Sequence, residues 1–200
     1  MNGFKREKSW IYRLKIPFDT VYTSVFLIRS AFGNLLVDCA SSGEDVERYI
    51  LPSLEKKGIS LSEIDALILT HRHSDHAGGL SKVLELAPSI KVISDVREIY
   101  DGIFTYPMAG HTEDCIGLLD IHSGTLISGD GLQGSGVDKY RCYTKSPEEY
   151  LKTLDRVMND KRIDNLLFSH AYEPWSREHA FGRKEVEHCI CECKKYIKEA

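Results

Sequence analysis

Three strand patterns precede the first helix pattern in this chain, and this order limits the folds that the sequence can adopt. Alternating apolar residues predict strands over residues 10–16, 21–29 and 35–38, with a turn at Gly33-Asn34 between the last two. From Ser42 onward, helix patterns alternate with short apolar runs. A strand-rich opening followed by this alternation favours two sheets faced by helices over one doubly wound sheet.

The rest of the chain continues the alternation. A helix pattern begins at Ser42 and stops at Gly58, with Pro52 predicting a kink or an early end, and another covers residues 79–87 before Pro88. Further strands are predicted over residues 64–70, 91–94, 103–107, 115–121, 125–128 and 163–169, and further helices over residues 146–158 and 177–198. A glycine-rich loop is predicted over residues 129–145, between the predicted strand 125–128 and the predicted helix 146–158. With 200 residues and no repeat or linker, we expect a single domain over residues 1–200.

Charge and composition exclude several classes of protein. The net charge is -4 and the basic residues are scattered, which disfavours nucleic acid as a partner. Residues 1–17 lack the apolar stretch of a signal peptide, and no apolar run is long enough to cross a membrane. We therefore expect a cytoplasmic protein that acts on a small molecule and binds no membrane, with an oligomeric state that the sequence leaves open.

The cysteines are not predicted to form disulfide bonds that hold the fold. In a chain without an export signal, the six cysteines are predicted to be reduced thiols. Cys189, Cys191 and Cys193 lie in a helix pattern, where residues two apart point in different directions. Partly buried thiols on a terminal helix are the preferred interpretation of this cluster.

The segment after the predicted strand 64–70 carries the strongest chemical signal. It reads Thr-His-Arg-His-Ser-Asp-His-Ala-Gly-Gly over residues 70–79. Imidazole and carboxylate groups at this density suit zinc and similar ions, and burying them unpaired would cost much free energy. In an extended loop His71 and His73 face the same way, while Asp75 and His76 turn toward a second position at the start of the following helix. The sequence therefore predicts a metal site here.

The pattern His71-x-His73-x-Asp75-His76 resembles the signature of the metallo-β-lactamase superfamily. Other landmarks of that family follow in order over residues 20–172: Asp38 in Leu35-Leu-Val-Asp-Cys39, Gly110-His111-Thr112, Ser128-Gly-Asp130 and Ser169-His170-Ala171. The resemblance implies an α/β fold, a four-layer αβ/βα sandwich in which two mixed β-sheets are flanked by helices.

The resemblance also implies a site for two divalent transition-metal ions, most simply zinc, with iron or manganese as alternatives. In that family pattern one ion is bound by His71, His73 and His111, the other by Asp75, His76 and His170, and Asp130 bridges them. Asp38 orients a ligand without touching metal. Such a pair of ions supplies a hydroxide near neutral pH, with Asp75 as the catalytic residue that orients it or passes a proton.

The functional branch that the chain resembles is that of the hydroxyacylglutathione hydrolases, which cleave thioesters and have relatives that open lactones. The helical domain that holds glutathione in those enzymes has no counterpart after His170. A thioester, lactone or other ester-type bond is therefore the expected substrate class. The residues expected to contact the substrate are Tyr22, Tyr140, Arg141, Tyr143 and Trp175.

Three alternatives remain open at this point. A persulfide dioxygenase-like oxidoreductase shares much of the histidine signature but uses one iron ion. A phosphodiesterase of the same fold is a further possibility, as is a noncatalytic binding protein. Metal analysis and a substrate panel separate these alternatives from a zinc-dependent hydrolase.

Overall fold

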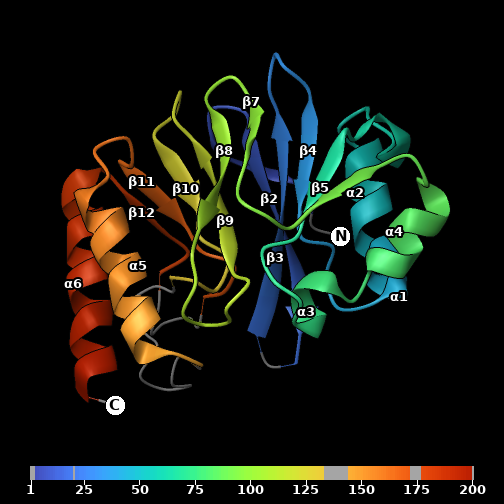
Figure 1. The fold of residues 1–200 in the computed structure, drawn as a ribbon. Coiled ribbons are helices and arrows are strands. Elements are labelled where there is room, and N and C mark those ends of the chain that lie inside the picture. The colour runs from blue at the N-terminus through green and yellow to red at the C-terminus, as the bar shows by residue number, and fades with distance from the viewer. Residues whose placement is uncertain (1–2, 20, 133–143, 172–176, 200) are drawn as a thin grey trace. The chain divides into compact units, whose positions relative to one another are not determined.

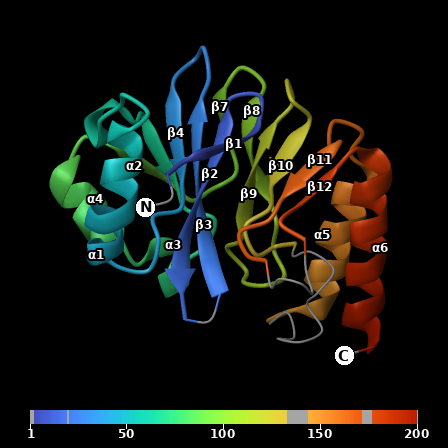
Figure 2. The same ribbon diagram turned by 180° about the vertical axis from the view of Figure 1, so that it is seen from behind.

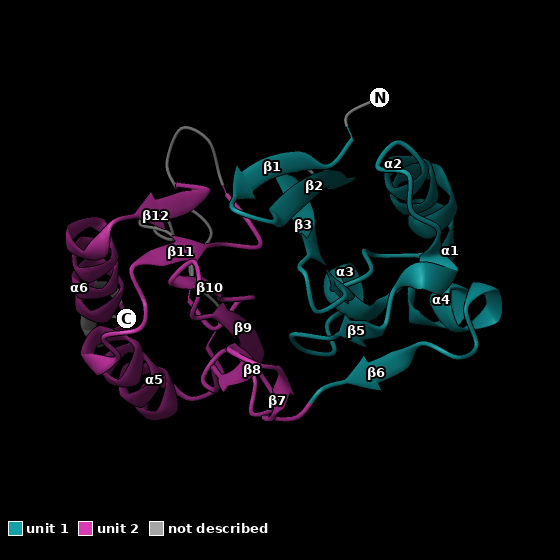
Figure 3. Ribbon diagram, turned by 90° about the horizontal axis from the view of Figure 1, so that it is seen from above, with its two compact units in different colours: residues 1–94 teal, residues 95–200 magenta. Residues whose placement is uncertain are grey.

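The computed structural model describes residues 3–19, 21–132, 144–171 and 177–199. The chain divides into two compact units, residues 1–94 and residues 95–200, which Figure 3 shows in separate colours. Each unit holds one six-stranded sheet, and both sheets mix parallel and antiparallel neighbours. The predicted fold class, two mixed β-sheets flanked by helices, is confirmed. A single domain over residues 1–200 stays a prediction.

The sheet of unit 1 has the strand order β1-β2-β3-β4-β5-β6 (Figure 1). The strands are β1 (Lys5–Lys8), β2 (Ile11–Phe18), β3 (Val21–Arg29), β4 (Asn34–Val37), β5 (Ala66–Ile68) and β6 (Lys91–Ile93). The first four strands form an antiparallel meander, whereas β4, β5 and β6 run parallel. Because parallel strands need crossover connections, helices appear only after β4.

Most of the helical segments of unit 1 lie on one face of this sheet (Figure 1). Ser42 caps α1 (Gly43–Asp45), and a π-helical turn, η1 (Val46–Ile50), leads into α2 (Leu51–Glu55). A short 3₁₀ turn, η2 (Leu61–Glu63), precedes β5, and α3 (Ser74–Ala77) and α4 (Leu80–Leu86) join β5 to β6. Pro52 lies in the first turn of α2, where its missing N–H is tolerated, so it marks a change of helix type and not a stop.

The core of unit 1 forms where alternate residues of the strands meet the helices. Leu14 and Ile16 of β2, and Val25 and Leu27 of β3, are fully or almost fully buried in one cluster with Val46, Ile50, Leu54 and Val83 from the helical segments. The spacing of two in the strands follows from their alternating side chains, and burial of this apolar surface drives the packing.

Unit 2 has the strand order β12-β11-β10-β9-β8-β7. The strands are β7 (Glu98–Tyr100), β8 (Ile103–Pro107), β9 (Ile116–Asp120), β10 (Thr125–Ile127), β11 (Asn165–Leu167) and β12 (His179–Phe181). Only β10 and β11 run parallel, and α5 (Pro147–Asn159) makes the crossover between them. The final helix, α6 (Arg183–Glu199), lies beside α5 (Figure 2), and both contribute to the core of this unit.

The prediction of one continuous helix over residues 177–198 was wrong in its first part. Residues His179–Phe181 form β12, which pairs with β11, and α6 begins only at Arg183. Gly182 has a φ of 88°, in the left-handed region that glycine adopts without strain, and so separates the two elements. Strands β1 and β7 and helix α3 were also missed, because each is only three or four residues long.

The three cysteines of the terminal helix divide between its faces. Cys189 and Cys193, four residues apart on α6, are buried in the core of unit 2, while Cys191 is exposed.

Among the helices of the described residues, none has the length and hydropathy of a membrane-spanning segment.

Candidate metal centre

The candidate residues of unit 1 follow the ends of two neighbouring parallel strands. Asp38 comes directly after β4, and Thr70 and His71 come two and three residues after β5. The carboxyl ends of parallel strands meet at one edge of a sheet, so residues that are far apart in sequence become neighbours there. Helix α3 follows this loop and carries Asp75 and His76, and His76 lies beside Asp38 at the same edge.

Asp38 holds this edge together through buried hydrogen bonds. Its Oδ1 accepts from the backbone N–H of Thr70 at 2.8 Å, and both carboxylate oxygens lie within 3.0 Å of the Thr70 hydroxyl. Its Oδ2 lies 2.7 Å from Nδ1 of His76. All three side chains are fully buried. A carboxylate bound to Nδ1 fixes the ring so that Nε2 is the nitrogen left for another partner.

The remaining candidates of unit 1 turn their nitrogen and oxygen atoms toward one another. Nε2 of His71 and Nδ1 of His73 are 3.0 Å apart, and the two rings meet edge to face. Nε2 of His76 lies 3.4 Å from Oδ2 of Asp75. The ring centroids of His71 and His76 are 4.2 Å apart. His71 and His76 are buried, whereas His73 is exposed.

Close backbone packing places α3 against the loop that follows β4. A Cβ atom on Gly78 would lie 2.0 Å from the carbonyl oxygen of Ser41, and one on Gly79 would lie 2.1 Å from that of Cys39. The backbone N–H of Cys39 donates to the carbonyl of His76 at 2.8 Å. Only glycine allows this approach, which fixes where α3 presents its side chains.

The candidate residues of unit 2 also follow strands that end at one edge. Strands β8 and β10 point the same way because each is antiparallel to β9, and β11 is parallel to β10. His111, Asp130 and His170 each follow one of these three strands within four residues. Asp130 lies between the two histidines: its Oδ2 is 3.6 Å from Nε2 of His111, and its Oδ1 is 3.4 Å from Nε2 of His170. All three residues are buried.

The start of α5 holds the loop that carries His111. Lys145 and Ser146 donate backbone N–H groups to the carbonyls of His111 and Gly110, at 3.3 and 3.1 Å. The hydroxyl of Thr153 donates to the carbonyl of Ala109 at 2.6 Å. The loop therefore has a fixed course relative to the sheet of unit 2, and the position of the His111 ring follows from it.

The donor atoms in each unit fit a zinc ion. Two ligands bound at about 2.0–2.1 Å to one tetrahedral ion lie roughly 3.3 Å apart. The four separations given above for pairs of candidate ligands within a unit lie between 3.0 and 3.6 Å. Neutral imidazole and carboxylate are the groups that zinc prefers. This spacing of oxygen and nitrogen donors is the observation on which a metal site rests in this chain.

Comparison with known proteins agrees with this chemistry. Residues 18–102 match the model of the family described as the metallo-beta-lactamase superfamily. A "Beta-lactamase-like protein 2 homolog" from Drosophila melanogaster is 28% identical over 168 residues, covering 70% of this chain and 55% of that protein. A hydroxyacylglutathione hydrolase from Vibrio campbellii is 26% identical over 138 residues, covering 60% of this chain and 53% of that enzyme. The matched region thus spans about half the length of these relatives.

The fold has close counterparts among solved structures. The metallo-β-lactamase FIM-1 from Pseudomonas aeruginosa, in its mono-zinc form, superimposes with a TM-score of 0.74 at 14% sequence identity, covering 97% of this chain and 95% of that one. Residues 18–102 of this chain are similar to the metallo-β-lactamase superfamily. The family match ends at residue 102, so the candidate ligands of unit 2 rest on the geometry above and on the resemblance of their short motifs.

Of the five residues expected to contact substrate, only Tyr22 lies within the described residues. Tyr22, on β3, is half-buried, and Nζ of Lys15 lies 4.7 Å from the centre of its ring. A contact between Tyr22 and substrate stays a prediction. Tyr140, Arg141, Tyr143 and Trp175 lie outside the described residues.

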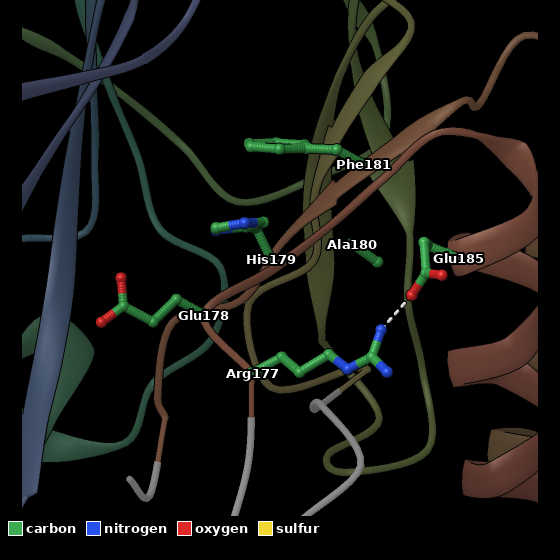
Figure 4. Close-up of a pocket in the computed structure, with 6 residues that line it drawn as sticks. All are labelled: Arg177, Glu178, His179, Ala180, Phe181 and Glu185. Atoms are coloured by element: carbon green, nitrogen blue, oxygen red, sulfur yellow. Dashed lines mark hydrogen bonds and ion pairs between the residues drawn. The ribbon is translucent and has the colours of Figure 1, made fainter. Parts of the chain in front are cut away.

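A pocket of about 420 Å³ lies along β12 and is lined by Arg177, Glu178, His179, Ala180, Phe181 and Glu185 (Figure 4). The His179 and Phe181 rings stack with centroids 4.1 Å apart, and Arg177 forms an ion pair with Glu185. The backbone N–H of Phe168 donates to the carbonyl of Glu178, which ties the two segments together. The walls carry opposite charges, so they do not select an anion or a cation.

Thr70 is the residue of the candidate site that sequence patterns did not single out. It begins the histidine-rich segment, and its hydroxyl lies within 3.4 Å of carboxylate or imidazole atoms of three other residues: Asp38, His71 and His76. The only signal in the sequence was a polar residue at the end of a buried apolar run.

Proposed function

We propose that this chain is a metal-dependent hydrolase that cleaves a small-molecule thioester, lactone or other ester-type bond. One observation carries the proposal: within each unit, the candidate imidazole and carboxylate atoms face one another at the separations expected of ligands to one ion. The match of residues 18–102 to the metallo-β-lactamase superfamily supports it, because hydrolases are among the similar proteins.

The proposed ligand sets draw on both units. His71, His73 and His111 hold one ion in this proposal, Asp75, His76 and His170 hold the other, and Asp130 contributes to both. The position of Asp130 between His111 and His170, with one oxygen toward each ring, supports a bridging role. Zinc is the proposed metal because the donors are nitrogen and oxygen atoms in tetrahedral spacing.

Metal ions bound by these residues would lower the pKa of the attacking water and polarise the bond under attack. The chain's own residues do the rest. Asp75, whose Oδ2 faces Nε2 of His76, is positioned to accept a proton from water and to pass it to the leaving group. Asp38 holds Nδ1 of His76 and keeps Nε2 directed toward Asp75.

The proposed substrate class rests on the relatives. Hydroxyacylglutathione, which gives one similar enzyme its name, is a thioester. This chain matches about half of that enzyme, so glutathione itself is not part of the proposal. Thioesters and lactones share an electrophilic carbonyl that a water molecule can attack without a covalent intermediate on the protein.

A substrate panel combined with metal analysis tests the proposal. The full chain, loaded with zinc, is assayed with an acyl thioester, a lactone and a phosphodiester, and with a persulfide under oxygen. We expect turnover of the thioester or the lactone, and its loss in His73→Ala. His188→Ala is the matched control, because His188 is an exposed histidine on α6 that contacts Glu192. Oxygen consumption with the persulfide and one bound iron would overturn the proposal, as would turnover of the phosphodiester alone.

A further inference from the structure

The hydroxyl of Thr70 occupies the centre of a buried group of polar side chains. It lies 3.0 and 2.9 Å from the two carboxylate oxygens of Asp38, 3.2 Å from Nδ1 of His71 and 3.4 Å from Nδ1 of His76. Thr70, Asp38 and His76 are fully buried, and His71 is 2% exposed. Bulk water is therefore not the hydrogen-bond partner of this hydroxyl.

The protons in this group can be assigned from donor and acceptor chemistry. A carboxylate only accepts hydrogen bonds, so the single Thr70 hydroxyl proton is directed to Asp38. The hydroxyl oxygen then presents only lone pairs to Nδ1 of His71, and that nitrogen must carry the proton for a hydrogen bond to form. Nδ1 of His76 donates to Asp38 by the same reasoning.

We propose that Thr70 is a positioning residue that fixes His71 in the tautomer with the proton on Nδ1, so that Nε2 carries the lone pair that would bind a metal ion. Asp38 does the same for His76, and Thr70 holds Asp38 in place with its backbone N–H and its hydroxyl. This inference rests on the metal site of the proposed function. It explains why a hydroxyl lies at a buried position that follows an apolar strand.

The alternative is that Thr70 only fills space. Valine has nearly the same shape but no hydroxyl, so it keeps the packing and the backbone hydrogen bond to Asp38 and removes the hydroxyl's hydrogen bonds to Asp38 and His71. Serine keeps the hydroxyl and loses a methyl group. Thr70→Val and Thr70→Ser therefore separate the two explanations. Thr105→Val is the matched control, because Thr105 in unit 2 is also buried and its hydroxyl donates to backbone carbonyls, at 2.7 Å to Asp95.

Two measurements test the inference on the full chain. The first is the zinc dissociation constant, measured by competition with a chelator of known affinity. Loss of a residue that orients metal ligands typically weakens binding by about 10–100-fold, and we expect this for Thr70→Val, with Thr70→Ser and Thr105→Val close to the wild-type chain. Equal zinc affinity in Thr70→Val and wild type would overturn the inference while leaving the metal site intact. A wild-type chain that binds no zinc would instead overturn the proposed function.

The second measurement is made on the wild-type chain, so it does not depend on whether a variant folds. Long-range proton–nitrogen NMR spectra of the wild-type chain distinguish a protonated Nδ1 from a protonated Nε2 in each histidine. We expect His71 to carry its proton on Nδ1 in the zinc-loaded chain and after the zinc has been removed. A metal-free wild-type chain in which Nε2 of His71 carries the proton would overturn the inference.

Discussion

Oδ2 of Asp38 and Nδ1 of His76 lie 2.7 Å apart, although 38 residues separate them in the sequence, and both side chains are fully buried. A carboxylate and an imidazole that are both removed from water stabilise the fold only if each satisfies the other's hydrogen-bonding groups. The contact therefore couples the fold of unit 1 to the orientation of one proposed metal ligand.

Replacing Asp38 with asparagine should weaken metal binding more than folding. Asparagine keeps the size of the side chain but puts an amide N–H₂ where one carboxylate oxygen accepts hydrogen bonds from Thr70 or His76. We expect zinc affinity to fall by about 10-fold or more, measured by chelator competition. Asp65→Asn is the control, since Oδ2 of Asp65 accepts from the backbone of Asn34 at an exposed position. Unchanged zinc affinity in Asp38→Asn would show that this contact is structural only.

Adding a methyl group at Gly79 should displace α3. Its Cβ would lie 2.1 Å from the carbonyl oxygen of Cys39 and 2.5 Å from a methyl group of Val46, and a backbone oxygen cannot move aside as a flexible side chain can. We expect Gly79→Ala to lower the free energy of unfolding by about 1–3 kcal/mol, measured in urea. In the control Gly3→Ala, the nearest atom to the new Cβ is Cδ of Lys56 at 3.6 Å, so stability should not change. Equal stability of both variants would contradict the packing described for α3.

The buried thiol of Cys115 should make the fold less stable at alkaline pH. Burial raises the pKa of Cys115 from its ordinary value of 9.0 to about 11, and the hydrogen bond with Thr112 offsets part of that effect. The unfolded chain therefore releases this proton above about pH 9 while the folded chain keeps it, so stability falls as pH rises from 9 toward 11. The contribution of one such group is at most about 1.4 kcal/mol for each pH unit.

Urea titrations of wild type and Cys115→Ala across this pH range check that prediction. The free energy of unfolding should fall less steeply with pH in the variant. Below the ordinary pKa of the thiol, the difference in stability between the two proteins should stay constant. Parallel curves over the whole range would mean that Cys115 ionises equally in the folded and unfolded chains.

Much of the fold followed from the sequence because local patterns and long-range packing agree. The strand predicted over residues 21–29 is β3, and its alternating residues Val25 and Leu27 lie in the core. Ser146-Pro147 predicted the start of α5, where the Ser146 side chain caps the helix. These elements are long, or have strong end signals.

The elements that were not predicted are strands that form by pairing with strands elsewhere in the chain. Strand β1 is the charged segment Lys5–Lys8, and only its pairing with β2 makes it a strand. Strand β12 has three residues and forms because its backbone pairs with β11. The local sequence does not predict such pairing, so residues 177–181 were assigned to the helix that follows.

The candidate site was predicted only to the level of residue identity. The spacing of His71, His73, Asp75 and His76 indicated metal binding, and the structure places these side chains within reach of one another. The role of Thr70 could not be predicted, because it depends on Asp38 reaching the end of a neighbouring strand. Asp38 itself adopts a φ of 62°, a conformation that aspartate tolerates better than most residues.

We propose that seven side chains of this chain hold two metal ions. Elemental analysis of the purified full chain, after zinc loading and removal of unbound metal, tests it most directly when wild type is compared with Asp130→Ala and His73→Ala. We expect two zinc ions per wild-type chain and a clear loss in both variants, with circular dichroism showing that they remain folded. Wild-type chain without bound metal, or variants that are folded and keep the full wild-type metal content, would contradict it.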